Sequence, residues 1–218
     1  MTATDLAREA LGADASPAHR LDRATSGVLL FARSSRVAAL LSATFEEGAV
    51  EKVYLALVRG SPPDEGTIDH PIPRREDGPR VPAITTFRTL FRVASTAPGA
   101  GDRAGAEDVA SVLRRASLVE ARPRTGRLHQ VRRHMKHVSH PLIGDANYGK
   151  GAINRTFAEA IGLRRLALHA ISLRLPHPIT GAPLCFEADL PPDLAVPFER
   201  LGIPDTAWRP RGALRTKL

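Results

Sequence analysis

The segment HRLDRATSG, residues 19–27, places a carboxylate among basic side chains at a turn. Asp22 lies between Arg20 and Arg23, with His19 close by, and positive neighbours favour the ionised form of a carboxyl group. An ionised carboxylate can act as a nucleophile or stabilise positive charge that develops on a substrate. The alternative is an ordinary surface pair between Asp22 and an arginine, followed by Thr-Ser-Gly as common turn residues.

A second polar segment, TGRLHQVRRH, spans residues 125–134. We predict a helix over residues 127–138, which puts His129, Arg132 and Arg133 at positions i, i+3 and i+4 on one face. Such a face can bind a phosphate or pair with a carboxylate from elsewhere in the chain. A solvated basic helix face is the alternative.

Tyr54 is one of two tyrosines in a chain that is 5% aromatic. The alternation in residues 50–58 predicts a strand with Lys52, Tyr54 and Ala56 on the face away from the likelier core. A chain with so few aromatic residues cannot stack on the many bases of a long single strand of RNA, but Tyr54 could stack on one flipped base. A half-buried strand tyrosine is the alternative.

The charge of the chain favours a polyanionic partner. The net charge is +8 and the isoelectric point is near 10.6, which points to nucleic acid before a neutral metabolite. Between residues 114 and 140 a single acid, Glu120, accompanies eight basic residues: Arg114, Arg115, Arg122, Arg124, Arg127, Arg132, Arg133 and Lys136. We interpret this segment as a basic patch.

Metal chemistry is not indicated by the sequence. Cys185 is the only cysteine, so neither a disulfide within the chain nor a cysteine-based zinc site can form. The histidines at 129, 134, 137 and 140 lack the spacing of a ligand set. The N-terminal residues do not form a signal peptide and no apolar stretch is long enough to span a bilayer, so we expect a cytoplasmic protein. We also expect a monomer.

The elements that must position these residues suggest an α+β fold. The hydrophobic periodicity and the turn residues predict strands at 27–33, 50–58, 84–93, 117–121, 166–175 and 183–190, and helices at 5–11, 34–45, 127–138, 154–161 and 194–201. Residues 62–82 read as a loop with one short strand. We expect a single domain over residues 1–218, with a mobile loop at 94–108 and a basic tail at 203–218.

Four segments in order resemble the RluA-type pseudouridine synthases. HRLDRATSG resembles the catalytic-aspartate motif of the family and EKVYLALVRG its tyrosine motif. TGRLHQVRRH with the following HPLIGD resembles its basic-helix motif, and LALHA its closing strand. The resemblance covers nearly the whole chain, from about residue 19 to residue 177. It implies a mixed, largely antiparallel sheet with flanking helices, an RNA substrate, and no need for a cofactor or metal.

The resemblance also implies roles for individual residues. It assigns Asp22 as the essential carboxylate, Tyr54 as the aromatic beside the target base, and Arg132 as the ion-pair partner of Asp22. Leu168 would be an apolar wall of the pocket and Arg20 would help fill the space that the flipped base leaves. We add His19, Arg127 and His129 to the expected substrate-binding residues.

Within the family the resemblance is strongest to the TruC subgroup, which modifies tRNA where the T stem meets the acceptor stem. A large-subunit ribosomal RNA pseudouridine synthase is the second hypothesis, and a non-catalytic RNA-binding protein of the same fold is the third. One departure is that family members usually begin with two strands and a Lys-Pro-x-Gly motif. Residues 1–18 contain neither, so we expect either a start codon that is placed too late or a protein with a shortened N-terminal region.

Overall fold

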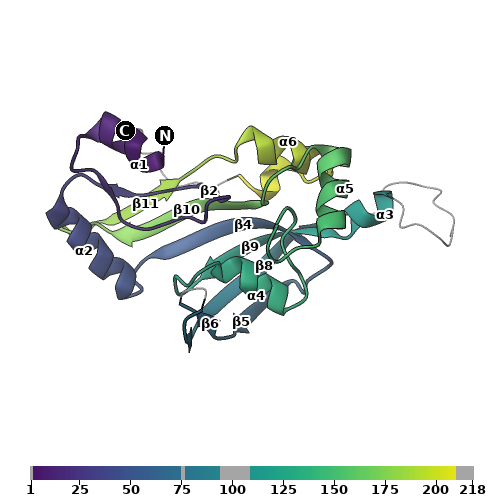
Figure 1. Cartoon of the computed structure of the whole chain (residues 1–218), viewed down its shortest axis with the longest axis horizontal. Helices are drawn as coiled ribbons and strands as arrows, with labels where there is room; N and C mark the ends of the chain where they lie inside the picture. The colour runs from purple at the N-terminus through teal and green to yellow at the C-terminus, as the bar shows by residue number, and fades with distance from the viewer. Residues whose placement is uncertain (1, 75–76, 94–108, 210–218) are drawn as a thin grey trace.

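A seven-stranded mixed sheet forms the centre of the computed structural model, which describes residues 2–74, 77–93 and 109–209 (Figure 1). Its order is β11-β10-β4-β9-β8-β5, with β2 paired to β10. The strands are β2 (Ser26–Gly27), β4 (Glu51–Arg59), β5 (Glu65–Asp69), β8 (Ile84–Arg92), β9 (Ala116–Pro123), β10 (Leu168–Pro176) and β11 (Pro183–Glu187). Only the β2–β10 pair is parallel among these pairings, which confirms the predicted mixed, largely antiparallel sheet.

Helices gather at both ends of the sheet, and two small strand pairs flank it. Figure 1 shows α3, α5 and α6 at one end and α1 and α2 at the other. The helices are α1 (Ala3–Leu11), α2 (Ser35–Glu46), α3 (Val109–Arg114), α4 (Gln130–His137), α5 (Gly151–Ile161), α6 (Pro192–Arg200) and a 3-10 turn at Asp205–Ala207. The small pairs join β1 (Ser16–Pro17) to β3 (Phe31–Ala32), and β6 (Ile72–Pro73) to β7 (Arg80–Val81).

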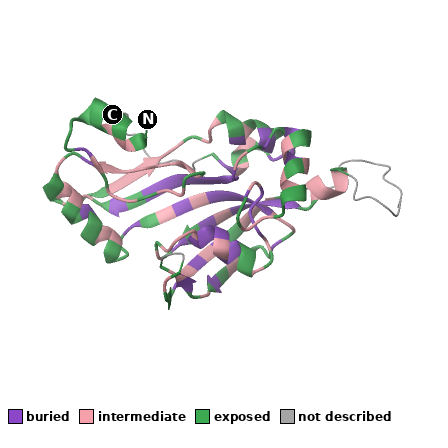
Figure 2. Cartoon of the chain, viewed as in Figure 1, coloured by how far each residue is buried: buried purple, intermediate pink, exposed green. Residues whose placement is uncertain are grey.

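Strand β4 is buried on both faces. Leu55 and Leu57 pack in the core with Phe157 of α5 and Phe198 of α6, and each fully buried side chain of this size stabilises the fold by about 1.5–3 kcal/mol. The opposite face carries Ala56 and Val58, which pack under α4. Figure 2 shows the buried residues concentrated along the central strands. The predicted alternation is therefore confirmed, but the face that carries Tyr54 also lies against a core.

Local signals account for the helices that were predicted well. The Ser34 side chain accepts a hydrogen bond of 3.3 Å from the N–H of Val37, so α2 begins where its cap predicts. Thr2 and Asp5 form a reciprocal capping box at the start of α1. Helices α5 and α6 also lie within a few residues of their predicted bounds.

The predicted strand at 27–33 is wrong in its continuity. Gly27 has φ +116°, which takes the chain out of an extended run after β2. Phe31–Ala32 then pairs with Ser16–Pro17 and not with the main sheet. The loop predicted at 62–82 is more ordered than expected, because it carries β5, β6 and β7.

The mobile loop predicted at 94–108 lies outside the described residues, as does 210–218. The basic tail begins later than residue 203, because Ile203 and Trp208 are 1% and 6% exposed and belong to the core. The N-terminal region forms α1 and β1, of which β1 joins a small strand pair outside the central sheet.

Candidate active site

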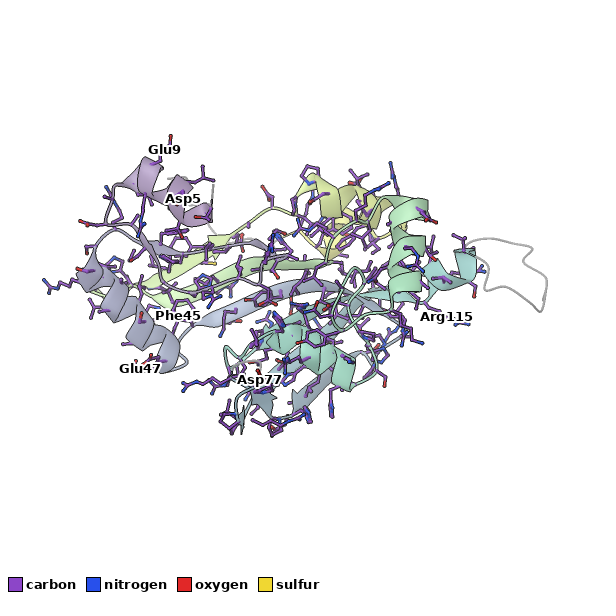
Figure 3. All side chains as sticks on the ribbon, in the orientation of Figure 1. Asp5, Glu9, Phe45, Glu47, Asp77 and Arg115 are labelled. Atoms are coloured by element: carbon purple, nitrogen blue, oxygen red, sulfur yellow. The ribbon has the colours of Figure 1, made fainter. Side chains whose placement is uncertain are left out.

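A cavity of about 870 Å³ opens beside the aspartate turn. Its walls come from residues 18–25, the end of α2, strand β4, the turn at 123–127 and the first turn of α4, with Leu168 of β10. Figure 3 labels Phe45 and Glu47, which stand on the α2 side of this cavity. Of the predicted site residues, the cavity brings together His19, Arg20, Asp22, Tyr54, Arg127 and Leu168.

Hydrogen bonds from the backbone and from side chains hold the aspartate turn in place. The N–H of Thr25 donates to the carbonyl oxygen of Asp22 at 2.8 Å and closes the turn. Beyond the turn, the Ser26 hydroxyl lies 2.9 Å from Nδ1 of His169 on β10. On its outer side, Nη2 of Arg165 donates to the carbonyl of Ala24 at 3.0 Å. The position of Asp22 is therefore determined by the sheet.

Gly27 allows the turn to approach the sheet. It pairs with Ala170, and a Cβ built on Gly27 would lie 2.2 Å from the carbonyl oxygen of Ala170. Its φ of +116° is also unfavourable for any residue with a Cβ. The glycine that follows the aspartate motif is thus required by the contact between β2 and β10.

Arg132 joins Asp22 to a second carboxylate, Asp145. The Nε and Nη2 atoms of Arg132 donate to the two oxygens of Asp145 at 2.8 and 2.9 Å, and Nη1 lies 3.3 Å from Oδ2 of Asp22. The side chain of Asp145 is 0% exposed and that of Asp22 is 25% exposed. Arg132 itself lies behind the cavity wall and not among the residues that line it. A buried guanidinium with two carboxylate partners fixes the orientation of the accessible one.

Asp145 also organises the loop that follows it. Its Oδ1 accepts hydrogen bonds from the backbone N–H groups of Asn147 and Tyr148 at 2.9 and 3.0 Å. Burial alone would raise the pKa of Asp145, but the hydrogen bonds from Arg132 and from this backbone outweigh it and hold the pKa below its usual value. Asp145 is therefore an ionised, buried anchor for Arg132.

His129 is placed differently from the prediction. Helix α4 begins at Gln130, and His129 precedes it in the left-handed conformation with φ 53°. His129 therefore does not share a helix face with Arg132 and Arg133, and it does not line the cavity. Its Nδ1 lies 3.0 Å from the hydroxyl of Tyr148, which also accepts a hydrogen bond from Nε of Arg133 at 2.7 Å.

Tyr54 lies next to Asp22 in the cavity. Burial, and then the negative charge of Asp22, raise the pKa of Tyr54 to about 12. The phenol is consequently protonated at neutral pH. Leu168, 3% exposed, lies on the neighbouring strand and supplies an apolar part of the same lining.

His19 is neutral and does not add positive charge near Asp22. Burial lowers the pKa of His19 to about 4. Its Nε2 accepts a hydrogen bond of 3.1 Å from the N–H of Leu30, and its ring stacks on Phe45 with the centroids 5.0 Å apart. The expectation that His19 helps keep Asp22 ionised is therefore wrong, while Arg20 stands exposed at the cavity rim.

The basic patch predicted over residues 114–140 is divided in the structure. Arg115 follows α3, and Figure 3 labels it at the end of the molecule away from Phe45. Arg122 pairs with Glu51 and with Glu120. Arg124 and Arg127 are the members of the segment that line the cavity. The sequence predicted one continuous basic patch, but the structure separates its charged side chains.

Comparison with known proteins gives the family. A model of the RNA pseudouridylate synthase family matches residues 1–137. The chain belongs to this family. Proteins named tRNA pseudouridine synthase C are similar to it: the one from Salmonella typhimurium is 41% identical over 84% of this chain and 71% of its own length. The one from Haemophilus ducreyi is 40% identical over 89% of this chain and 80% of its own length.

Solved structures of the same family share the fold. Human RNA Pseudouridylate Synthase Domain Containing 4 matches with a TM-score of 0.67 and 26% identity, over 91% of this chain and 81% of that one. Human RNA Pseudouridylate Synthase Domain Containing 1 matches with a TM-score of 0.65 and 26% identity, over 88% and 76%. This chain is therefore an RNA pseudouridine synthase of the RluA type with the expected fold.

Several residues around the site of this pseudouridine synthase had no role in the sequence-based prediction. Asp145 and Tyr148 stand in HPLIGDANYG, which carried the family resemblance without a stated function. Lys52 lines the cavity, and its spacing of two residues from Tyr54 on the same strand was the available signal. Arg165 had no signal, because its contact with Ala24 spans 141 positions in the sequence.

The histidines of the basic segment have other partners. His134 is 0% exposed, with Nδ1 2.8 Å from the hydroxyl of Thr85 and Nε2 3.0 Å from the carbonyl of His70. Within residues 2–74, 77–93 and 109–209, no group of three or more His, Cys, Asp or Glu is arranged to hold a metal ion. No helix in that part of the chain is long and apolar enough to cross a bilayer.

Proposed function

We propose that this pseudouridine synthase isomerises a uridine in tRNA, near the junction of the T stem and the acceptor stem, with Asp22 as its catalytic carboxylate. The observation that carries the proposal is the position of Asp22. This partly exposed carboxylate lies on a turn fixed to the sheet, 3.3 Å from Arg132 and beside Tyr54 in a cavity of about 870 Å³.

The reaction suits a single carboxylate. Pseudouridine forms when the bond from N1 of uracil to C1′ of ribose breaks and a bond from C5 to C1′ replaces it. Attack by a carboxylate on C1′ or on the base, and assistance to the loss of the C2′ proton, each use an ionised group at the position of Asp22. All atoms and the oxidation state of the substrate are kept, so the proposed reaction requires no redox cofactor.

The other site residues have supporting roles in this proposal. Arg132 holds Asp22 in place, and Leu168 provides an apolar wall for the flipped uracil. Tyr54 stacks beside the base, and its hydroxyl, which enters the reaction protonated, relays the C5 proton: the phenol oxygen accepts this proton as its own proton passes to N1, which has lost its bond to C1′. Arg20 is exposed at the rim, where it could fill the space that the base leaves in the RNA helix.

The cavity is suited to one flipped nucleotide in structured RNA. Moving a base out of its helix costs a few kcal/mol, which phosphate contacts can offset. Of the residues that the structure describes, five with basic side chains line the cavity: Arg20, Lys52, Arg74, Arg124 and Arg127. The tRNA substrate is supported by relatives named tRNA pseudouridine synthase C. The single cysteine suits a reducing compartment, and we further propose that the enzyme works in the cytoplasm. We propose a monomer as well.

Incubation with bulk tRNA and, separately, with unmodified ribosomal RNA tests this proposal. Modified positions are mapped with a pseudouridine-specific chemical adduct, and the Asp22→Asn variant provides the blank. We expect pseudouridine in tRNA only, at the stem junction. Pseudouridine in ribosomal RNA and not in tRNA would contradict the proposed tRNA substrate but not the proposed reaction.

A further inference from the structure

Lys52 stands in the candidate active site beside Tyr54. Both belong to β4, two residues apart, and both side chains line the cavity. Residues with this spacing project from the same strand face with Cα atoms about 7 Å apart. The ammonium group of Lys52 therefore occupies a separate, neighbouring position in the cavity that holds Asp22.

The turn at 125–127 fixes Lys52. Its Nζ donates to the carbonyl oxygen of Thr125 at 3.1 Å. Gln130 holds this turn in place. Its Oε1 accepts hydrogen bonds from the Thr125 hydroxyl at 2.7 Å and from the N–H of Arg127 at 3.0 Å. Gln130 is itself tied to β8 through the carbonyl of Ile84 at 2.9 Å. Lys52 and Arg127 are thus held on one preorganised support.

Among the described residues, neither cation has a carboxylate partner. Within the described ranges, no ion pair joins Lys52 or Arg127 to a carboxylate. In the part of the chain that the structure describes, the Arg127 guanidinium makes one long hydrogen bond, of 3.3 Å from Nε to the carbonyl oxygen of Pro82. Burial, and then the charge of Arg127, lower the pKa of Lys52. The contrast is Arg132, which has two carboxylate partners.

An ammonium group has three N–H donors, and the Thr125 carbonyl uses one of them. Two partly buried cations without an anion between them are electrostatically unfavourable, and a bound anion would relieve both. A phosphodiester offers this charge with several acceptor oxygens. Glu46 and Glu47, at the end of α2, form another part of the lining and disfavour phosphate there.

We propose that Lys52 and Arg127 bind a phosphodiester that flanks the target uridine while its base lies between Asp22, Tyr54 and Leu168. This inference rests on the proposed function, because it requires a flipped nucleotide in the cavity. It assigns Lys52 a binding role, in which the phosphate contact sets the position of the ribose relative to Asp22.

Single methylphosphonate substitutions in the RNA test this contact, because each replaces one charged phosphate oxygen with a methyl group. The substrate is a short RNA stem that contains the mapped uridine, neutralised at the phosphate 5′ or 3′ to it. We compare the wild type, Lys52→Met and Lys150→Met. Lys150 is an exposed lysine before α5 that does not line the cavity, so it is the matched control.

For the wild type we expect one of the two substitutions to weaken RNA binding about ten- to hundred-fold. Lys52→Met should lose part of this affinity with unmodified RNA, and that methylphosphonate should weaken its binding by less than it weakens the wild type, because only the Arg127 contact then remains to be lost. Its log–log salt slope should be smaller by about 0.7–0.9, the value for one contact. Lys52→Arg, which keeps the charge, should restore the slope. When the phosphate is neutralised, Lys150→Met should lose as much RNA affinity as the wild type does.

Equal losses in Lys52→Met and in the wild type would overturn the proposal. So would a wild-type enzyme that tolerates both neutral phosphates, a result that does not depend on the folding of any variant. Wild-type turnover on unmodified RNA is measured first. Absence of turnover at that step counts against the proposed function. Normal turnover, with affinity losses from Lys52→Met and from the methylphosphonate that simply add, counts against the phosphate contact alone.

Discussion

Arg132 is bound more closely to Asp145 than to Asp22. Two hydrogen bonds of 2.8 and 2.9 Å join the guanidinium to the buried Asp145, and a single contact of 3.3 Å joins it to Asp22. Asp145 therefore acts as the anchor and Asp22 as the accessible partner. This arrangement leaves the Asp22 carboxylate partly free for a substrate while its orientation is kept.

Replacing Asp145 by Asn should destabilise the protein and lower its turnover. The substitution leaves the Arg132 guanidinium buried with a weakened partner, and breaking a buried ion pair costs about 3–5 kcal/mol. The free energy of unfolding is measured by denaturant titration. Asp205→Asn is the control, since it breaks the exposed Arg209–Asp205 pair and should cost less than about 1 kcal/mol. Equal costs for the two variants would show that Asp145 is not an anchor.

Tyr54→Phe should bind RNA as the wild type does but lose most of its turnover. The ring that stacks on the base is kept, while the hydroxyl proposed to handle the C5 proton is removed. Because the pKa of Tyr54 is raised to about 12, its ionisation should not affect the pH–rate profile between pH 6 and about 9. Single-turnover rates decide the matter, and wild-type rates in the variant would reduce Tyr54 to a packing residue.

Gly27→Ala should displace the aspartate turn from β10. A left-handed backbone costs a residue with a Cβ about 1–3 kcal/mol, and here the new Cβ would also meet the carbonyl of Ala170 at 2.2 Å. Gly12→Ala is the matched control, because Gly12 has φ +103° with no atom within 4 Å of the added Cβ. The temperature of thermal unfolding and the turnover rate should both fall further in Gly27→Ala than in Gly12→Ala. Similar losses in the two variants would attribute the effect to backbone strain alone.

Stability should fall as the pH drops below about 6.5, in part because of His19. Burial lowers the pKa of His19 to about 4 in the folded state, against about 6.5 in the unfolded chain. The unfolded state thus binds more protons between these values, so this stabilisation is complete above pH 6.5 and is lost as the pH falls towards 4. His19→Asn should flatten the pH dependence of the unfolding free energy in this window. An unchanged slope would mean that His19 is not buried in its neutral form.

Local patterns predicted those parts of the fold that local interactions determine. Alternation defined β4, and the Ser34 cap defined the start of α2. The start of α4 was misplaced because Gln130 is held by Ile84 and Thr85, 45 and more positions away. The anchoring of Arg132 by Asp145 likewise depends on how the loop after α4 folds back. Tertiary contacts of this kind leave no periodic signal in the sequence.

Pseudouridine formation by Asp22→Asn tests directly whether Asp22 is the catalytic carboxylate. The substitution keeps the shape of the side chain and removes its charge, while the phosphate contacts that supply most of the RNA affinity remain. We expect no pseudouridine in tRNA after prolonged incubation, with RNA binding within a few-fold of the wild type. Measurable turnover by Asp22→Asn, or by Asp22→Ala, would contradict the assignment of Asp22 as the catalytic carboxylate.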